Sequence, residues 1–223
     1  MEPPNDKREA ILETALVLFT ERGFYGTPTA MISREAGVAT GTLFFYFKTK
    51  EELIDVLYRQ IKSEAASALR EGVDREQTAR AKIFRVGENA IAWSTTNQSK
   101  FRFMEQFAHS PFVSTTTHEE GMSHFLFLKE LIRDGIREGV IRESDTELLC
   151  SVLASSLSGI TARIMATSDP VRQKVLVRQG LAFLWNGIAT HPDEEPCGNN
   201  GEKTGTTKQN RQPGNGKYPG GIR

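Results

Sequence analysis

The chain has 223 residues, with 38% hydrophobic and 25% charged side chains, the composition of an ordinary soluble protein of one or two domains. Its formal net charge at pH 7 is zero, so the chain as a whole is not attracted to nucleic acid. Two cysteines are too few for a disulfide framework and favour a reducing compartment. The N-terminal residues have no apolar signal region, and no uninterrupted apolar run approaches a membrane span of about 20 residues. These features predict a cytoplasmic protein with no membrane partner.

The first predicted element is an amphipathic helix over residues 6–22. Its apolar face is formed by Ala10, Ile11, Ala15, Leu18 and Phe19. Asn5 or Asp6 can cap its start, because their side-chain oxygens can accept hydrogen bonds from the first N–H groups. Gly23 ends it, and Gly26 frees the chain for a turn.

Two short helices with a glycine between them are predicted next, over about residues 28–47. Thr27 can cap the first through its hydroxyl, and Pro28 at the first helical position loses no needed hydrogen bond. Gly37 stands where a positive φ would end that helix at little cost. The second helix opens with small residues, which let a helix end approach bases and phosphates: Ala39, Thr40, Gly41 and Thr42. A tight turn between two short helices predicts a helix-turn-helix, whose second helix reads the major groove.

A capping box starts the following helix, which is expected over about residues 50–69. The box is Thr49-x-x-Glu52. The buried face of this helix is formed by Leu53, Ile54, Leu57, Tyr58 and Ile61, and Gly72 is its stop signal.

A long ordered pattern runs through residues 7–57. It consists of Gly23-Phe24, Thr27, Ile32, Ala36-Gly37-Val38, Gly41-Thr42-Leu43, Tyr46-Phe47-Lys48 and Lys50-Glu51-Glu52-Leu53. In residue type and spacing this pattern resembles the TetR family of bacterial transcriptional regulators. The resemblance implies an all-α protein with a three-helix DNA-binding head, residues 5–64, whose fourth helix links to the body. It also implies a helical body, residues 65–190, for effector binding and dimerisation.

The resemblance implies which residues contact double-stranded DNA. Thr40, Thr42 and Phe45 would meet bases, and phosphates would be held by Thr27, Tyr46, Lys48 and Lys50. The full expected contact set is Thr27, Pro28, Arg34, Ala39, Thr40, Thr42, Phe45, Tyr46, Lys48 and Lys50. Phe45 stands where the family often has histidine, so it contributes an apolar contact, such as one with a thymine methyl, in place of a hydrogen bond.

The head is not basic, because its acidic residues outnumber its lysines and arginines. Neutralisation of DNA phosphates by lysine and arginine supplies most non-specific DNA affinity. The excess of acidic residues in the head therefore leaves a second functional class open. The alternative is a helical ligand carrier or adaptor that retains the helix-turn-helix as a scaffold.

Five further helices are predicted in the body. Their expected ranges are 76–95, 100–109, 115–138, 144–167 and 170–189. The middle ones carry aromatic and methionine side chains that suit an apolar ligand cavity, although a well-packed core explains any single one equally well. The candidate pocket residues are Trp93, Phe101, Met104, Phe107, Met122 and Phe125, with Glu105 and His109 as polar anchors. The resemblance implies a small apolar or aromatic effector in this region.

The last two helices combine apolar bulk with a face of small residues. Two such helices from each subunit can form a four-helix interface, and packing within one bundle is the alternative. The expected interface residues are Leu149, Val152, Ser155, Ser158, Gly159, Ala162, Leu181, Leu184 and Trp185.

Residues 191–223 are rich in Gly, Asn, Thr, Lys and Pro and are predicted to be a disordered polar tail. His118 and His124 are not spaced as a metal pair on one helix face, and no residues assemble a catalytic constellation. We therefore expect no cofactor, metal or enzymatic activity. The resemblance implies a ligand-responsive repressor that binds a palindromic operator as a homodimer.

Overall fold

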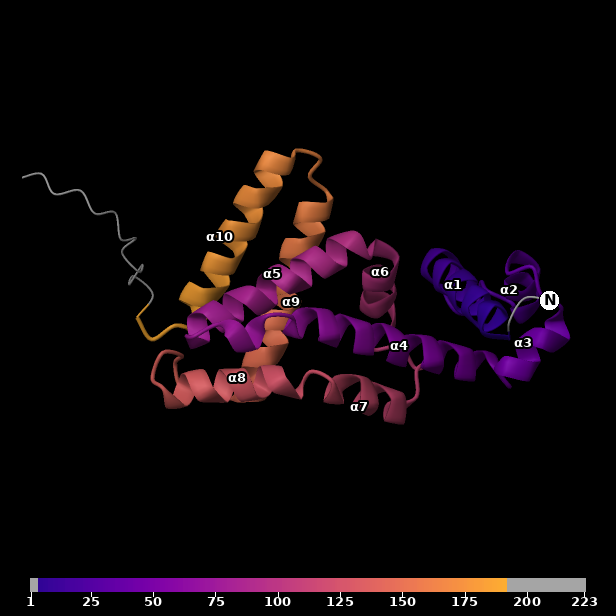
Figure 1. Cartoon of the computed structure of the whole chain (residues 1–223), viewed down its shortest axis with the longest axis horizontal. Helices are drawn as coiled ribbons and strands as arrows, with labels where there is room; N and C mark the ends of the chain where they lie inside the picture. Colours follow the sequence, from indigo (N-terminus) through magenta and orange to yellow (C-terminus); the bar gives the residue numbers. More distant parts are fainter. Residues whose placement is uncertain (1–3, 192–223) are drawn as a thin grey trace, which may run out of the picture. The chain divides into compact units, whose positions relative to one another are not determined.

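The structure is a computed structural model that describes residues 4–191, and these residues confirm the expected all-α fold (Figure 1). The head contains α1 (Pro4–Arg22), α2 (Thr29–Glu35) and α3 (Thr40–Tyr46). The long α4 (Lys50–Arg70) leads to a short 3-10 helix, Val73–Arg75. The remaining helices are α5 (Ala79–Thr96), α6 (Gln98–Phe107), α7 (Thr115–Ser123), α8 (Leu126–Arg137), α9 (Thr146–Met165) and α10 (Pro170–Ile188). Apart from His191, the predicted tail lies outside the described residues.

The turn between α2 and α3 forms where the sequence predicts it. Gly37 has a φ of 68°, which a side chain with a Cβ rarely adopts, and α2 ends just before it. The start of α2 differs from the prediction. Pro28 is the N-cap residue of α2 and not its first helical residue, and Thr27 does not cap the helix. The Thr27 hydroxyl instead donates to the carbonyl oxygens of Leu18, at 3.1 Å, and Gly23, at 2.8 Å.

The single long helix expected over residues 115–138 is wrong. The chain leaves the helix after Ser123 and starts α8 at Leu126. The physical reason is packing, because α7 lies against α4 whereas α8 lies against α5 and α9. A Cβ added at Gly121 of α7 would be 3.1 Å from the Tyr58 ring, so α7 approaches α4 closely.

The main apolar core joins the head to the body. It contains residues of α1, such as Phe19, together with Leu43 and Phe47 around α3 and the buried face of α4. Phe103 and Phe107 of α6 belong to the same core and are 0% and 2% exposed. The head therefore packs on α6 as well as on α4, and the boundary near residue 64 stays a prediction.

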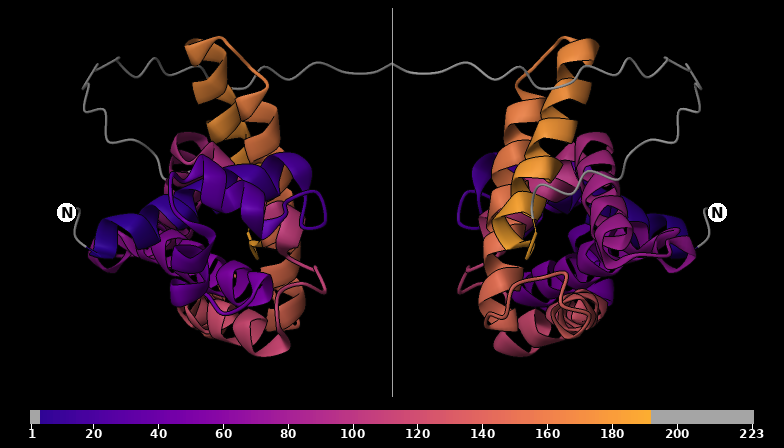
Figure 2. Two further views of the ribbon diagram at one scale, coloured as in Figure 1. Left: turned by 90° about the vertical axis from the view of Figure 1, so that its right-hand side faces the viewer. Right: turned by 90° about the vertical axis from the view of Figure 1, so that its left-hand side faces the viewer.

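At the other end of the body, α9 and α10 run side by side as a hairpin (Figure 2). Leu181 and Trp185 of α10 are buried against α5. A Cβ at Gly87 of α5 would lie 2.4 Å from a Leu181 methyl, so these helices meet at a residue without a side chain.

Gly26→Ala should lower the free energy of unfolding by about 1–3 kcal/mol, because the new Cβ would lie 2.3 Å from the backbone oxygen of Arg22. Urea denaturation at fixed protein concentration measures the change. The control is Gly187→Ala in α10, where no heavy atom lies within 4 Å of the added Cβ. Removing a helical glycine there should leave stability equal or raise it by up to about 1 kcal/mol. Equal behaviour of the two variants would show that the turn after α1 is not packed as described.

Candidate nucleic-acid interface

The short α3 has one buried and one exposed side. Leu43 is 0% exposed and Phe47, directly after the helix, is 1% exposed, so both anchor α3 in the core. On the other side Thr40 and Phe45 face solvent, and the Phe45 side chain is 72% exposed. A large apolar ring at that exposure contributes nothing to the core. The surface that α3 presents is therefore small and mixed, with hydroxyl, methyl and aromatic groups.

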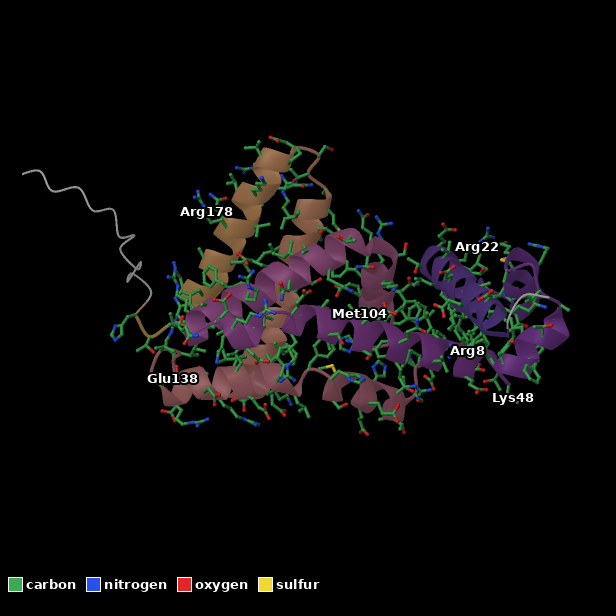
Figure 3. All side chains as sticks on the ribbon, viewed as in Figure 1. Arg8, Arg22, Lys48, Met104, Glu138 and Arg178 are labelled. Atoms are coloured by element: carbon green, nitrogen blue, oxygen red, sulfur yellow. The ribbon has the colours of Figure 1, made fainter. Side chains whose placement is uncertain are left out.

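Most of the predicted DNA contacts lie on this surface of the head. Pro28, Arg34, Ala39, Thr40, Phe45 and Lys48 are exposed, and Thr42 and Tyr46 are half-buried. Figure 3 shows Lys48 on the head beside α3, well away from the labelled Arg178 of α10. The structure thus brings eight of the ten predicted residues to one region of the head, within or next to α2 and α3.

Thr27 and Lys50 do not fit the predicted phosphate contacts. Thr27 is 0% exposed and its hydroxyl is bound to the end of α1, so it cannot meet DNA without unfolding the turn. The half-buried Lys50 ammonium donates to the carbonyl oxygens of Phe24, at 2.7 Å, and Thr27, at 3.1 Å. Two of its three donors are thus used inside the head. Burial lowers the pKa of Lys50, against a smaller opposite effect of the Glu51 charge.

The junction of α3 and α4 fixes the backbone of Lys48. The Thr49 hydroxyl accepts from the Glu52 N–H at 3.0 Å, as the capping box predicts. The return bond is displaced by one residue, because the Glu52 carboxylate accepts from the Lys48 N–H at 2.6 Å. Lys48 therefore has a fixed backbone and an exposed side chain, which suits contact with a phosphate.

The eight predicted pocket residues differ in how deeply they are buried. Phe107 is buried in the core shared with the head, and Trp93 and Met104 pack against that core. Phe101 and Phe125 are half-buried, while Glu105, His109 and Met122 are exposed. Phe107 is thus a core residue, because α6 must cover the apolar side of α1. Two surface hollows of the described residues lie elsewhere, one on α9–α10 and one at the C-terminal end of α4.

Lys62 of α4, which the sequence did not single out, places its ammonium between two aromatic rings. The Lys62 ammonium of α4 lies 5.4 Å from the centre of the Tyr58 ring and 5.3 Å from that of Phe125. Within the described range, no residue is hydrogen-bonded or ion-paired to this ammonium. Burial lowers the pKa of Lys62, against a smaller opposite effect of the Glu105 charge. The signal in the sequence was its spacing, since Lys62 follows Tyr58 by one helical turn.

Glu105 of α6 is fixed by α9. Its carboxylate accepts a hydrogen bond from the Ser158 hydroxyl at 2.5 Å. Ser158 was expected in the dimer interface, but its hydroxyl is directed to a residue of the same chain. The pair connects two helices near Lys62 and leaves the ammonium without a bound carboxylate.

The outer face of α9 and α10 is apolar and exposed. Val152 is 51% exposed and Phe183 is 77% exposed, while Ser155, Gly159 and Ala162 also face solvent and Leu149 and Leu184 are half-buried. Leu181 and Trp185 are corrections to the predicted interface, because they are only 5% and 6% exposed and pack inward on α5. A hollow of about 530 Å³ lies on this face. It is lined by Ser156, Gly159, Ile160, Arg163, Leu176, Gln179, Gly180 and Phe183.

The sequence of α9 is apolar on average, although polar residues interrupt it. In the part of the chain that the structure describes, α9 is long and apolar enough to cross a membrane by length and composition, with a mean hydropathy of 1.5. Only 11% of that window is buried in the chain. The hydroxyls of Ser151, Ser155 and Ser158 interrupt its apolar sequence, and its exposed apolar side chains line a face shared with α10. We interpret this helix as an uncovered packing face.

Comparisons with known proteins agree with this geometry. Residues 11–57 match the family model described as bacterial regulatory proteins, tetR family. A solved structure of a putative tetR family transcription regulator from Shewanella sp. PV-4 is 33% identical, with a TM-score of 0.77, and the match covers 83% of this chain and 99% of that one. The uncharacterized HTH-type transcriptional regulator YhgD of Bacillus subtilis (strain 168) is 27% identical over 154 residues, which is 66% of this chain and 78% of YhgD.

A third similarity concerns the fold alone. The transcriptional regulator FadR from Bacillus subtilis, solved in complex with stearoyl-CoA, is 20% identical with a TM-score of 0.68, covering 81% of this chain and 98% of FadR. The helix-turn-helix match and the whole-length similarity to the Shewanella structure agree with the geometry of α2 and α3. The chain therefore belongs to the TetR family of bacterial transcriptional regulators.

Proposed function

We propose that this regulator is a ligand-responsive repressor that acts in the cytoplasm and binds a palindromic operator as a homodimer. The observation that carries the proposal is α3, whose buried side is anchored by Leu43 and Phe47 while its opposite side is free. A short helix held in this way fits the major groove, which is wide enough for one helix.

The exposure of each side chain indicates which part of the DNA it would contact. Thr40 and Thr42 contact base edges, and the Phe45 ring packs on a thymine methyl because it has no hydrogen-bonding group. Lys48 holds a phosphate, since its ammonium is exposed and its backbone is fixed by Glu52. Phosphate contacts position the helix, and base contacts select the sequence.

The proposed dimer uses the outer face of α9 and α10. A two-fold axis makes the same patch meet itself, so each copy offers the Phe183 ring and also the hollow beside Gly159 and Gly180. The exposed apolar helix α9 supports this pairing, because large apolar patches on soluble proteins mark interaction sites. The pairing places two α3 helices in the same molecule, and successive major grooves on one side of DNA are about 34 Å apart.

The proposed effector is an apolar molecule with an anionic group that reaches Lys62. An ammonium between the Tyr58 and Phe125 rings, with no bound carboxylate, is a partly desolvated cation that an anion stabilises. An effector that binds better to the DNA-free arrangement shifts the population toward it and releases the operator. The fatty acyl ligand in the FadR structure is a property of that protein and gives this proposal a comparable ligand chemistry.

Lys48→Ala should weaken binding to all sequences by a similar factor, because the lost contact is with the backbone. The slope of log K against log salt should fall by about one, as expected for one released counterion. Mobility shifts with the chain's own upstream DNA from low salt upward measure both quantities. Lys82→Ala, in the first turn of α5, is the control and should change neither. An unchanged slope would remove Lys48 from the phosphate contacts, and failure of the wild type to shift any upstream fragment would favour the carrier alternative.

Phe183→Glu should convert the dimer into a monomer, because it places a charge in the apolar face of each copy. Sedimentation velocity over a range of concentrations measures the state. The matched control is Leu126→Glu at the start of α8, where the leucine is 52% exposed outside the proposed face. A dimer that survives Phe183→Glu at all concentrations would place the interface elsewhere.

Among apolar ligands, fatty acids should raise the melting temperature of the wild type more than the alcohols of equal chain length. Only the acid carries the charge that Lys62 would hold. Lys62→Met should remove the difference while leaving the response to alcohols, and Lys82→Met should leave both responses unchanged. Equal shifts by acid and alcohol in the wild type would exclude an anionic group at this position.

A further inference from the structure

The turn between α1 and α2 is held by an aromatic ring from the body. Phe24, in that turn, stacks on Phe112 with ring centroids 4.2 Å apart and an interplanar angle of 5°. Tyr25 meets the same ring edge-on at 4.9 Å. Phe112 lies in residues 108–114, which join α6 to α7. We call Phe24, Tyr25 and Phe112 the aromatic clamp.

The head side of the clamp is fixed by α4. The Lys50 ammonium lies 4.0 Å from the centre of the Phe24 ring and donates to the Phe24 carbonyl oxygen. Phe24 thus has a cation near its ring and the flat face of Phe112 stacked against it. A ring held by these two contacts cannot tilt freely.

The body side of the clamp is fixed as well. The Phe112 N–H donates to the Ser110 hydroxyl at 3.2 Å, and the Ser114 N–H donates to the Asp55 carboxylate of α4 at 2.9 Å. Val113, between them, is 3% exposed and belongs to the core shared by head and body. The segment that carries Phe112 is therefore an ordered bridge from the end of α6 to the head.

Phe24 and Tyr25 of the clamp lie in the turn directly before α2, the first helix of the helix-turn-helix. α1 also packs directly against α6, and Figure 1 shows these two helices next to each other. The Gln106 amide of α6 donates to the Phe19 carbonyl oxygen in the last turns of α1, at 3.4 Å. α6 is therefore connected to the turn before α2 by direct contacts of its own, in addition to the contacts that run through α4.

We propose that Phe112 is a positioning residue for DNA binding, which transmits the position of α6 to the helix-turn-helix through Phe24. The proposal rests on the proposed DNA-binding function. It adds a second connection between body and head beside α4. The ring is the active part, since stacking of two aromatic faces needs a ring and not only apolar bulk.

The experiment compares Phe112→Leu with Phe112→Tyr in the full chain. The leucine keeps apolar volume without a ring, whereas the tyrosine keeps the ring. Fluorescence anisotropy with a labelled duplex of the chain's own upstream region gives DNA affinity at fixed salt. Phe112→Leu should weaken DNA binding about threefold to tenfold, the range expected for loss of one aromatic pair. Phe112→Tyr should bind DNA with the affinity of the wild type. The control is Phe127→Leu in α8, whose ring contacts Arg70 and not the head.

A double variant tests the coupling between the two rings. If Phe112 acts through Phe24, the Phe24→Leu/Phe112→Leu variant should bind DNA no more weakly than Phe24→Leu alone. Additive losses, or wild-type binding by Phe112→Leu, would overturn the proposal. Hydrogen exchange gives a readout that does not depend on DNA. Phe112→Leu should speed amide exchange in residues 23–29 by about threefold to tenfold, the factor expected for loss of the same aromatic pair, without changing exchange in α9.

The two proposals fail in different ways. A wild type that binds no upstream duplex contradicts the DNA-binding function, while faster exchange in residues 23–29 of Phe112→Leu still supports the clamp. Unchanged exchange in that turn overturns the clamp even when the wild type binds DNA tightly.

Discussion

The rest of the structure depends on how the seven-residue helix α3 is held. Isolated helices shorter than about 12–15 residues are marginal in water, so α3 is stable only through its packing. Leu43 and Phe47 supply that packing, and each fully buried side chain of this kind contributes about 1.5–3 kcal/mol. The side chains on the exposed side of α3 are therefore not needed for packing, so they can be of the types that contact DNA.

The core that holds α3 also contains side chains of α6, so the head and the body share one apolar core. Phe19 of α1 contacts Phe107 of α6 edge-on, with ring centroids 6.2 Å apart. The effector that we propose would change DNA affinity only if its site and the DNA-binding site have a coupling free energy, and the shared core is where such coupling would act. Continuous packing between α6, α1 and α3 gives that coupling a physical path, as packed cores resist gradual deformation and transmit strain.

The sequence predicted the parts of the molecule that depend on local signals. The turn at Gly37 and the cap at Thr49 were found because backbone conformation and a neighbouring hydroxyl determine them. The break between α7 and α8 was missed because it arises from packing on two different helices, which no local pattern encodes. The inward positions of Leu181 and Trp185 were missed for a similar reason. The sequence pattern of an apolar residue on α10 is the same whether that residue packs on α5 or on a second copy of the chain. Thr27 likewise reads as a cap or contact until its carbonyl partners are known.

The most direct test of the account is a photocrosslink from the exposed face of α3. The photoreactive residue benzoylphenylalanine replaces Phe45 in one sample and Phe183 in another, and each is irradiated with the chain's own upstream duplex. We expect a protein–DNA crosslink from position 45 and only a protein–protein crosslink from position 183. A complex that forms without a crosslink at position 45, or with a DNA crosslink from position 183, would contradict the claim that α3 is the surface that meets DNA.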